Sequence, residues 1–199
     1  ALRSLGHFED AIISSQKVLS INPNHAVAHN NLGNIFFEMG KLDEAVKSFK
    51  RALKIEPNLV DAHCNLGTVL WNMGKFDQAA GFATKASHIS PNNANAHYTL
   101  GLAQQSLERR IEALTSFRRS VTLMPENDLF WNGLAGILCN THFLKVDEQM
   151  FTDLEHLLER PTVAVSNVIR PIMRILKHHS IFNEILNATN DDSKAFALS

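Results

Sequence analysis

The stretch AVAHNNLGNIFFEMGKLDEAVKSFKRALKIEP, residues 26–57, decides the fold. Within residues 26–39 the apolar side chains recur three and four apart, and Gly40 follows, which predicts a helix that ends there. Residues 42–55 show the same spacing, and Pro57 prevents the second helix from continuing. Two such helices joined by a tight turn form a helical hairpin.

The same pattern recurs every 34 residues through most of the chain. The repeated positions are Pro23, Pro57, Pro91 and Pro125; Ala11, Ala45, Ala79 and Ala113; Leu32, Leu66, Leu100 and Leu134; Gly33, Gly67 and Gly101, followed by Ala135; and Ile21, Ile55, Ile89, Leu123 and Leu157. One hairpin cannot bury its own apolar faces, whereas stacked hairpins supply one another's core. The sequence therefore predicts an all-α, right-handed superhelical solenoid of antiparallel helix pairs.

These positions resemble the tetratricopeptide repeat family, in which an aromatic residue, Leu-Gly, a second aromatic residue, Ala, Phe and Pro follow in fixed order. The best copy here reads His29, Leu32-Gly33, Phe36, Ala45, Phe49 and Pro57. The resemblance covers residues 1–159, as a half repeat 1–23, repeats 24–57, 58–91 and 92–125, and a degenerate repeat 126–159. In this last copy Asp147 replaces the expected Ala and Glu159 replaces the Pro.

After residue 159 the sequence no longer follows the 34-residue repeat pattern. We expect residues 160–188 to form C-terminal capping helices, because the end of a solenoid needs a polar outer surface. Residues 189–199 read as a tail or linker. The segment 176–182 is similar to what precedes the catalytic domain in bacterial fusions of such repeats with methyltransferases.

Composition narrows the classes of function. Nineteen Lys and Arg against 20 Asp and Glu leave a net charge of −1, which argues against nucleic acid as a partner. Apolar runs fall far short of the ~20 residues of a membrane span, so no membrane partner is expected. The first residues lack an initiating Met and a secretory signal, which indicates a piece of a longer, cytoplasmic protein. Cys64 and Cys139 are expected to be free, buried thiols.

No pattern of catalytic or cofactor-binding residues emerges. His29, His63 and His97 recur at the repeat spacing, but equivalent residues of stacked hairpins lie too far apart to share one zinc ion. We interpret them as packing residues in place of the family's usual Trp. Phosphate-binding loops, zinc-protease motifs and nucleophile elbows are absent from the sequence. We expect no enzyme activity, metal or cofactor.

The resemblance implies that the first helix of each hairpin lines a concave, peptide-binding face. Its candidate residues are rich in amides, which both donate and accept hydrogen bonds. They are Asn30, Asn31, Asn34, Phe37, Asp61, Asn65, Thr68, Trp71, Asn72, Asn95, Tyr98 and Thr99. Asn31 and Asn65 match the asparagine ladder of O-linked N-acetylglucosamine transferases, and Thr99 and Gly133 interrupt it. Chaperone-binding members hold a terminal carboxylate with Lys and Arg on this face, and those bases are missing here.

Three hypotheses follow. The first is a protein–protein interaction scaffold that binds an extended partner segment along this face. The alternative is the N-terminal substrate-recognition or regulatory arm of a larger transferase, either a methyltransferase or a glycosyltransferase. The third is self-association through the apolar face of the first helix, which contains Ile12, Val18 and Leu19.

Overall fold

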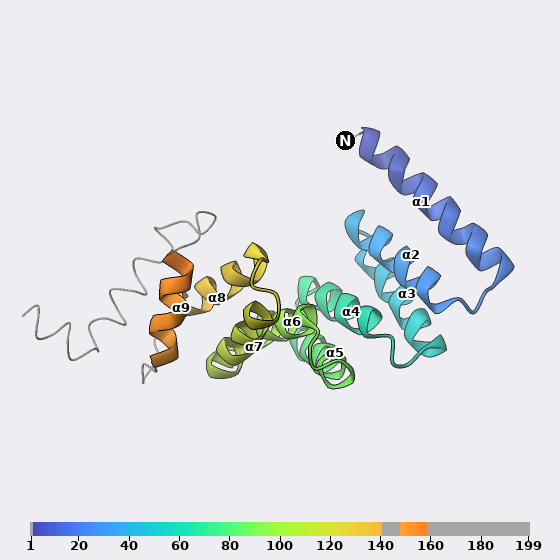
Figure 1. The fold of residues 1–199 in the computed structure, drawn as a ribbon. Helices are drawn as coiled ribbons and strands as arrows, with labels where there is room; N and C mark the ends of the chain where they lie inside the picture. The colour runs from blue at the N-terminus through green and yellow to red at the C-terminus, as the bar shows by residue number, and fades with distance from the viewer. Residues whose placement is uncertain (1, 141–147, 159–199) are drawn as a thin grey trace, which may run out of the picture. The chain divides into compact units, whose positions relative to one another are not determined.

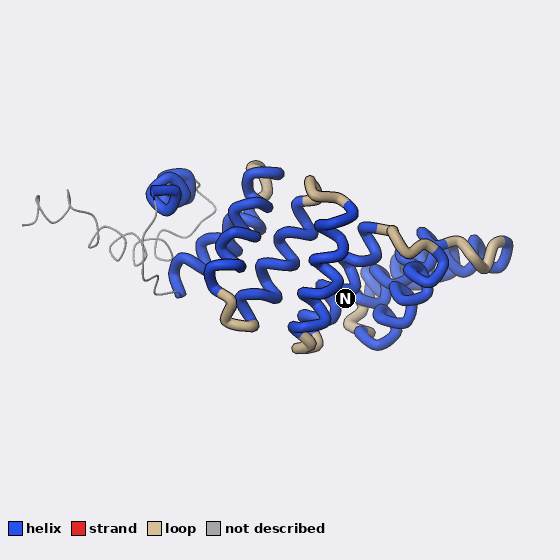
Figure 2. Tube along the Cα trace, turned by 90° about the horizontal axis from the view of Figure 1, so that it is seen from below, coloured by secondary structure: helices blue, strands red, loops and turns tan. Residues whose placement is uncertain are grey.

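The computed structural model describes residues 2–140 and 148–158, and every regular element in these two segments is a helix (Figures 1 and 2). The helices are α1 Leu2–Ile21, α2 Ala26–Glu38, α3 Leu42–Ile55, α4 Val60–Asn72, α5 Phe76–Ile89, α6 Ala94–Ser106, α7 Arg110–Leu123, α8 Asp128–Asn140 and α9 Glu148–Leu158. The predicted all-α helical repeat fold is confirmed, and the helices expected at 26–39 and 42–55 end within one residue of α2 and α3. The chain divides into two compact units, Ala1–Glu126 and Asn127–Ser199.

The first unit contains three hairpins, α2 with α3, α4 with α5 and α6 with α7. Each hairpin turn needs one residue with a left-handed backbone, and these residues are Gly40 (φ 76°), Gly74 (φ 73°) and Glu108 (φ 58°). The reversal lets the Lys41 amide donate to the Phe36 carbonyl at 2.8 Å, which satisfies an otherwise unpaired carbonyl at the end of α2. In two of the three turns, the glycine that follows the first helix is therefore the residue that adopts the positive φ.

Close contact between the two helices of a hairpin depends on glycine. A Cβ atom on Gly33 would lie 2.6 Å from Cε1 of Phe49, and one on Gly101 would lie 2.8 Å from Cδ1 of Phe117. Both phenylalanine side chains are fully buried. In these two hairpins the Gly of the first helix and the Phe of the second are therefore one packing unit.

The first and second helices of the hairpins form different layers. Among first helices, α2 contacts α4 and α4 contacts α6, whereas α3, α5 and α7 hardly touch one another. The first helices are thus the more closely spaced layer, which corresponds to the inner side of a curved stack. Helix α1 packs beside α2 and occupies the place of the second helix of the half repeat (Figure 1).

The described part of the second unit consists of α8 and α9, so the segments 128–140 and 148–158 of the predicted degenerate repeat are helical. Trp131 and His156 bring the two helices together, with ring centroids 5.9 Å apart and an edge-on angle of 76°. The predicted capping helices 160–188 and tail 189–199 lie outside the described residues. In the two described segments, none of the helices has the length and apolar character that crossing a membrane requires.

Candidate functional site

The three repeated histidines join loops to helices. The Nε2 atoms of His29, His63 and His97 each donate to the carbonyl of the proline six residues earlier, at 3.1, 2.8 and 2.9 Å. His63 is buried and also packs against the Phe82 ring at 5.8 Å. The packing role predicted for these residues therefore includes a hydrogen bond that was not predicted from the sequence. The signal was present, since each His stands at a constant distance from a Pro.

The described residues contain no cluster of three or more His, Cys, Asp or Glu side chains that could hold a metal ion. Cys64 is a free, buried thiol, as predicted. Burial raises its pKa to about 12, and the nearby Asp61 carboxylate acts in the same direction. A thiol of this kind is a poor nucleophile because it is almost never ionised at neutral pH. The Cys139 side chain lies outside the described part.

The candidate binding residues lie on α2, α4 and α6, and we call their exposed and half-buried members the inner face. Four of them are exposed, Asn31, Asp61, Asn72 and Asn95, and six are half-buried, Asn34, Phe37, Asn65, Thr68, Trp71 and Tyr98. On α4 the polar residues follow one another three and four apart, so they share one side of that helix. The helices of the inner face contain Glu38 and Asp61 but no Lys or Arg.

Two predicted residues do not belong to this surface. Asn30 is only 6% exposed and Thr99 only 3%. Asn30 accepts a hydrogen bond from the Asn65 amide at 3.2 Å, and the hydroxyls of Thr68 and Thr99 lie 3.3 Å apart. Both residues are buried because neighbouring first helices approach closely, and their polar groups are used in contacts between repeats. We therefore remove Asn30 and Thr99 from the candidate surface.

The amides that remain differ in how much hydrogen-bonding capacity they keep. The side chains of Asn31, Asn34 and Asn95 make no hydrogen bond with other described residues, so both the donor and the acceptor of each amide are available. Asn65 uses one of its N–H groups on Asn30, and Asn72 donates to the Thr68 carbonyl at 2.9 Å. The free amides are spread over α2 and α6.

The aromatic residues of the inner face also make contacts that stabilise the fold. Nε1 of Trp71 donates to the Ser106 hydroxyl at 2.9 Å, which links α4 to α6. Phe37 and Trp71 both pack against the main apolar core of the first unit. Tyr98 lies 5.7 Å from the Phe117 ring, and burial raises its pKa. All three rings are half-buried rather than fully exposed.

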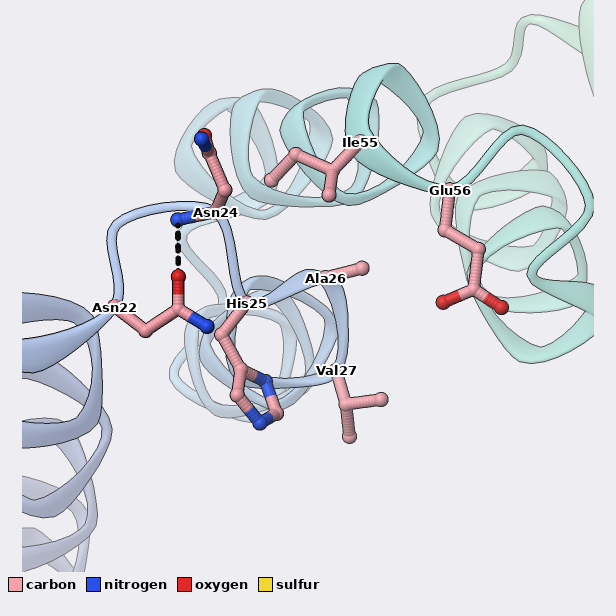
Figure 3. A pocket seen from close by; sticks show the side chains of 7 residues that line it. All are labelled: Asn22, Asn24, His25, Ala26, Val27, Ile55 and Glu56. Atoms are coloured by element: carbon pink, nitrogen blue, oxygen red, sulfur yellow. Dashed lines mark hydrogen bonds between the residues drawn. The ribbon is translucent and has the colours of Figure 1, made fainter.

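A pocket of about 340 Å³ lies elsewhere, where the α1–α2 loop meets the end of α3 (Figure 3). It is wide open to solvent and is lined by Asn22, Asn24, His25, Ala26, Val27, Ile55 and Glu56. The Asn22 side chain accepts from the Asn24 amide at 3.1 Å, and His25 caps α2 by accepting from the Ala28 amide. Its polar groups therefore hold the loop and the start of α2.

Four family profiles match the chain, and all describe the same kind of repeat. They are described as TPR repeat, over residues 33–74, and as tetratricopeptide repeat, over residues 1–25, 15–47 and 64–127. Together they extend from residue 1 to residue 127. No curated protein matches the chain.

Solved structures show the same fold. MamA 41-end from Desulfovibrio magneticus RS-1 has a TM-score of 0.64 at 23% identity, and the match covers 85% of this chain and 89% of that one. The first TPR domain of human RPAP3 has a TM-score of 0.56 at 25% identity, with 58% and 91% covered. The first TPR of Spaghetti (RPAP3) bound to the HSP90 peptide SRMEEVD has a TM-score of 0.54 at 25% identity, with 56% and 89% covered.

Proposed function

Because residues 1–127 belong to the tetratricopeptide repeat family, we propose that this part of the chain binds an extended segment of a partner protein across its inner face. Proteins built from these repeats act as scaffolds for protein–protein interaction. A similar domain, the first TPR of Spaghetti (RPAP3), was solved with a bound HSP90 peptide, which supports a peptide as the class of ligand. The role proposed for this chain is that of a non-enzymatic binding module.

The observation that carries the proposal is the set of unpaired amides. Asn31, Asn34 and Asn95 each offer a donor and an acceptor that no described residue satisfies. An extended peptide presents N–H and C=O groups in alternation along its length, and such amides can pair with them whatever the peptide's side chains. Recognition of this kind favours an extended backbone over a folded surface.

The charges of the inner face restrict the ligand. Asp61 belongs to it, Glu38 lies at the end of α2, and the helices α2, α4 and α6 contain no Lys or Arg, so nothing on the inner face neutralises a carboxylate. The segment bound there is accordingly neutral or basic, and a free acidic C-terminus is disfavoured, because a buried or half-buried charge needs a partner. In this respect the proposed ligand differs from the peptide SRMEEVD seen with the RPAP3 domain.

The test begins with a random peptide library displayed on phage and selected on the immobilised chain. Selected peptides are then titrated by fluorescence anisotropy against the wild type and against Asn31→Ala/Asn95→Ala. We expect binding to weaken about fivefold or more, since a lost hydrogen bond contributes about 1 kcal/mol. The melting temperature should change little because both side chains are exposed.

The matched control is Asn58→Ala/Gln78→Ala, which removes two exposed amides outside the inner face. This control should bind the selected peptides as tightly as the wild type. Equal affinity of the Asn31→Ala/Asn95→Ala variant and the wild type would refute the proposed site, and failure to enrich any peptide would refute the proposed function.

The alternative, a substrate-recognition or regulatory arm of a methyltransferase or glycosyltransferase, rests on Asn31 and Asn65. These two residues take equivalent positions in successive repeats, as in the asparagine ladder of O-linked N-acetylglucosamine transferases. Sequencing the gene beyond residue 199 tests this alternative directly. A transferase domain in the same reading frame supports it, and a stop codon shortly after residue 199 removes it.

A further inference from the structure

Positive charge in the repeats is segregated between the two helix layers. Helices α2, α4 and α6 contain no Lys or Arg, whereas α3 alone contains four. These four are Lys47, Lys50, Arg51 and Lys54, and all are exposed. Positions 47, 50, 51 and 54 are spaced three, four and seven apart, so their side chains share one face of the helix. We call these four residues the basic stripe.

The basic stripe has almost no compensating contacts. None of the three lysines forms an ion pair with a carboxylate or a hydrogen bond among the described residues. Arg51 makes one long hydrogen bond of 3.4 Å, to the Asn24 side chain of the α1–α2 loop. The stripe therefore keeps four positive charges that no carboxylate among the described residues neutralises.

The stripe also lies on an uncovered side of α3. The helix packs against α2 and α4 (Figure 1), and its buried residues are Ala45, Ser48, Phe49 and Ala52. Helix α1 packs on α2, and α5 packs on α4 and α6, so neither has more than slight contact with α3. The charged face is thus opposite the packed face, open to a partner.

The charge is concentrated on α3 rather than shared by the equivalent helices. Arg51 has basic equivalents 34 and 68 residues later, Lys85 and Arg119, and Lys50 has one basic equivalent, Arg118. At the positions of Lys47 and Lys54, however, α5 has Gly81 and His88, and α7 has Thr115 and Thr122. A helix-wide basic face is therefore a property of this one repeat and not of the repeat pattern.

We propose that the basic stripe is a docking surface for a short acidic segment of a partner protein, separate from the inner face. Residues 47 and 54 are seven apart, or about 10 Å along the helix axis. Three or four acidic residues in an extended chain, at about 3.3 Å each, match this length. The partner's carboxylates would pair with the lysines and with Arg51, which can hold a carboxylate through two parallel hydrogen bonds.

The surroundings of the stripe favour a short acidic protein segment over nucleic acid. Asp43 and Glu44 stand in the first turn of α3, before the stripe, and Glu56 follows its end. A long polyanion that ran past either end would meet these carboxylates. The net charge of the chain, −1, likewise provides no general attraction for a phosphate backbone.

In the test, the full chain is titrated with a capped tetraglutamate peptide at about 50 mM salt. Two-dimensional NMR records the change in the chemical shift of each backbone amide. We expect shifts concentrated in residues 44–56 and a millimolar dissociation constant, since exposed ion pairs are weak. A capped tetralysine peptide should cause no such shifts. Salt at about 300 mM should reduce the binding of tetraglutamate severalfold. Shifts spread evenly over the chain or centred on α2, α4 and α6 would overturn the proposal.

Charge reversal provides a second, independent test. Lys47→Glu/Lys50→Glu/Lys54→Glu should weaken tetraglutamate binding about tenfold or more, whereas Lys17→Glu/Lys75→Glu/Arg110→Glu, with the same change in net charge, should weaken it much less. Equal losses would mean that only net charge matters and would overturn the proposed surface. Should the first variant fail to fold by circular dichroism, Lys47→Gln/Lys50→Gln/Lys54→Gln replaces it.

Two further measurements separate this proposal from its alternatives. A twenty-nucleotide oligothymidine that binds the same stripe more tightly than tetraglutamate would overturn the assignment to an acidic protein segment. Asn31→Ala/Asn95→Ala should leave tetraglutamate binding unchanged, because those residues lie on the other helix layer. The proposal for the stripe therefore stands or falls independently of peptide binding at the inner face.

Discussion

Replacing Gly33 with Ala tests the close contact between the helices of one hairpin. The added Cβ would lie 2.6, 2.7 and 2.8 Å from three ring atoms of Phe49, whereas carbon atoms in contact normally lie about 3.5–4.0 Å apart. The ring is fully buried, so it cannot move away without displacing its neighbours. Overpacking of this kind costs about 3 kcal/mol, and the better helix propensity of Ala returns about 1 kcal/mol. We expect a net destabilisation of about 2 kcal/mol.

Gly81→Ala is the matched control, because Gly81 also lies inside a helix but has open space within 4 Å of the position that an added Cβ would take. This variant gains helix propensity without a clash and should be more stable than the wild type by about 0.5–1 kcal/mol. The two substitutions are chemically identical and should therefore change stability in opposite directions.

Thermal unfolding followed by circular dichroism measures both variants. We expect Gly33→Ala to lower the melting temperature by about 4–8 °C and Gly81→Ala to raise it by about 1–4 °C. In a double-mutant cycle, Gly33→Ala should be much less harmful when Phe49 is already Ala, because the clashing ring is gone. A Gly33→Ala variant at least as stable as the wild type would refute the packing argument.

Two further predictions concern His63 and Cys64. His63→Ala removes a buried ring and the 2.8 Å hydrogen bond to the Pro57 carbonyl, so urea unfolding should show that the free energy of unfolding falls by about 2 kcal/mol. For His29→Ala, where the ring is less buried, we expect a decrease of less than about 1 kcal/mol. Equal decreases in the two variants would contradict a role of burial. Because the pKa of Cys64 is raised from 9.0 to about 12, the folded protein keeps a proton that the unfolded chain loses, and this contribution to stability declines as pH rises from 9.0 to about 12. Cys64→Ala should therefore lose less stability than the wild type between about pH 8 and about pH 10.5 in urea titrations, and an identical decline in both proteins would contradict this assignment.

The helices could be predicted from the sequence because their signals are local and repeated. Pro57 and its equivalents end each second helix, and Gly40 and Gly74 supply the left-handed turns. The third turn was harder to foresee, since Glu108 adopts a positive φ without being glycine. Its position 34 residues after Gly74 was the available signal.

The candidate surface was only partly predictable. The sequence pattern predicted that both Asn30 and Asn31 belong to the binding surface. In the structure, Asn30 is buried and hydrogen-bonded to Asn65, whereas the Asn31 side chain is exposed and makes no hydrogen bond with other described residues. Adjacent residues on a helix point about 100° apart, so only one of the two faces the next repeat. The distance between neighbouring helices, which no local pattern encodes, settles the outcome.

By itself, the sequence determined the period, the helices and their ends, and the absence of basic residues from the first helices. These properties follow from residue identity and spacing along one chain. Only the tertiary structure decided which polar groups are consumed in contacts between repeats, as for Thr99, and which remain free, as for Asn95. It also decided that the face of α3 carrying Lys47 and Lys54 is left uncovered. The physical reason is that burial and pairing depend on neighbours that are more than 30 residues away in sequence but adjacent in space.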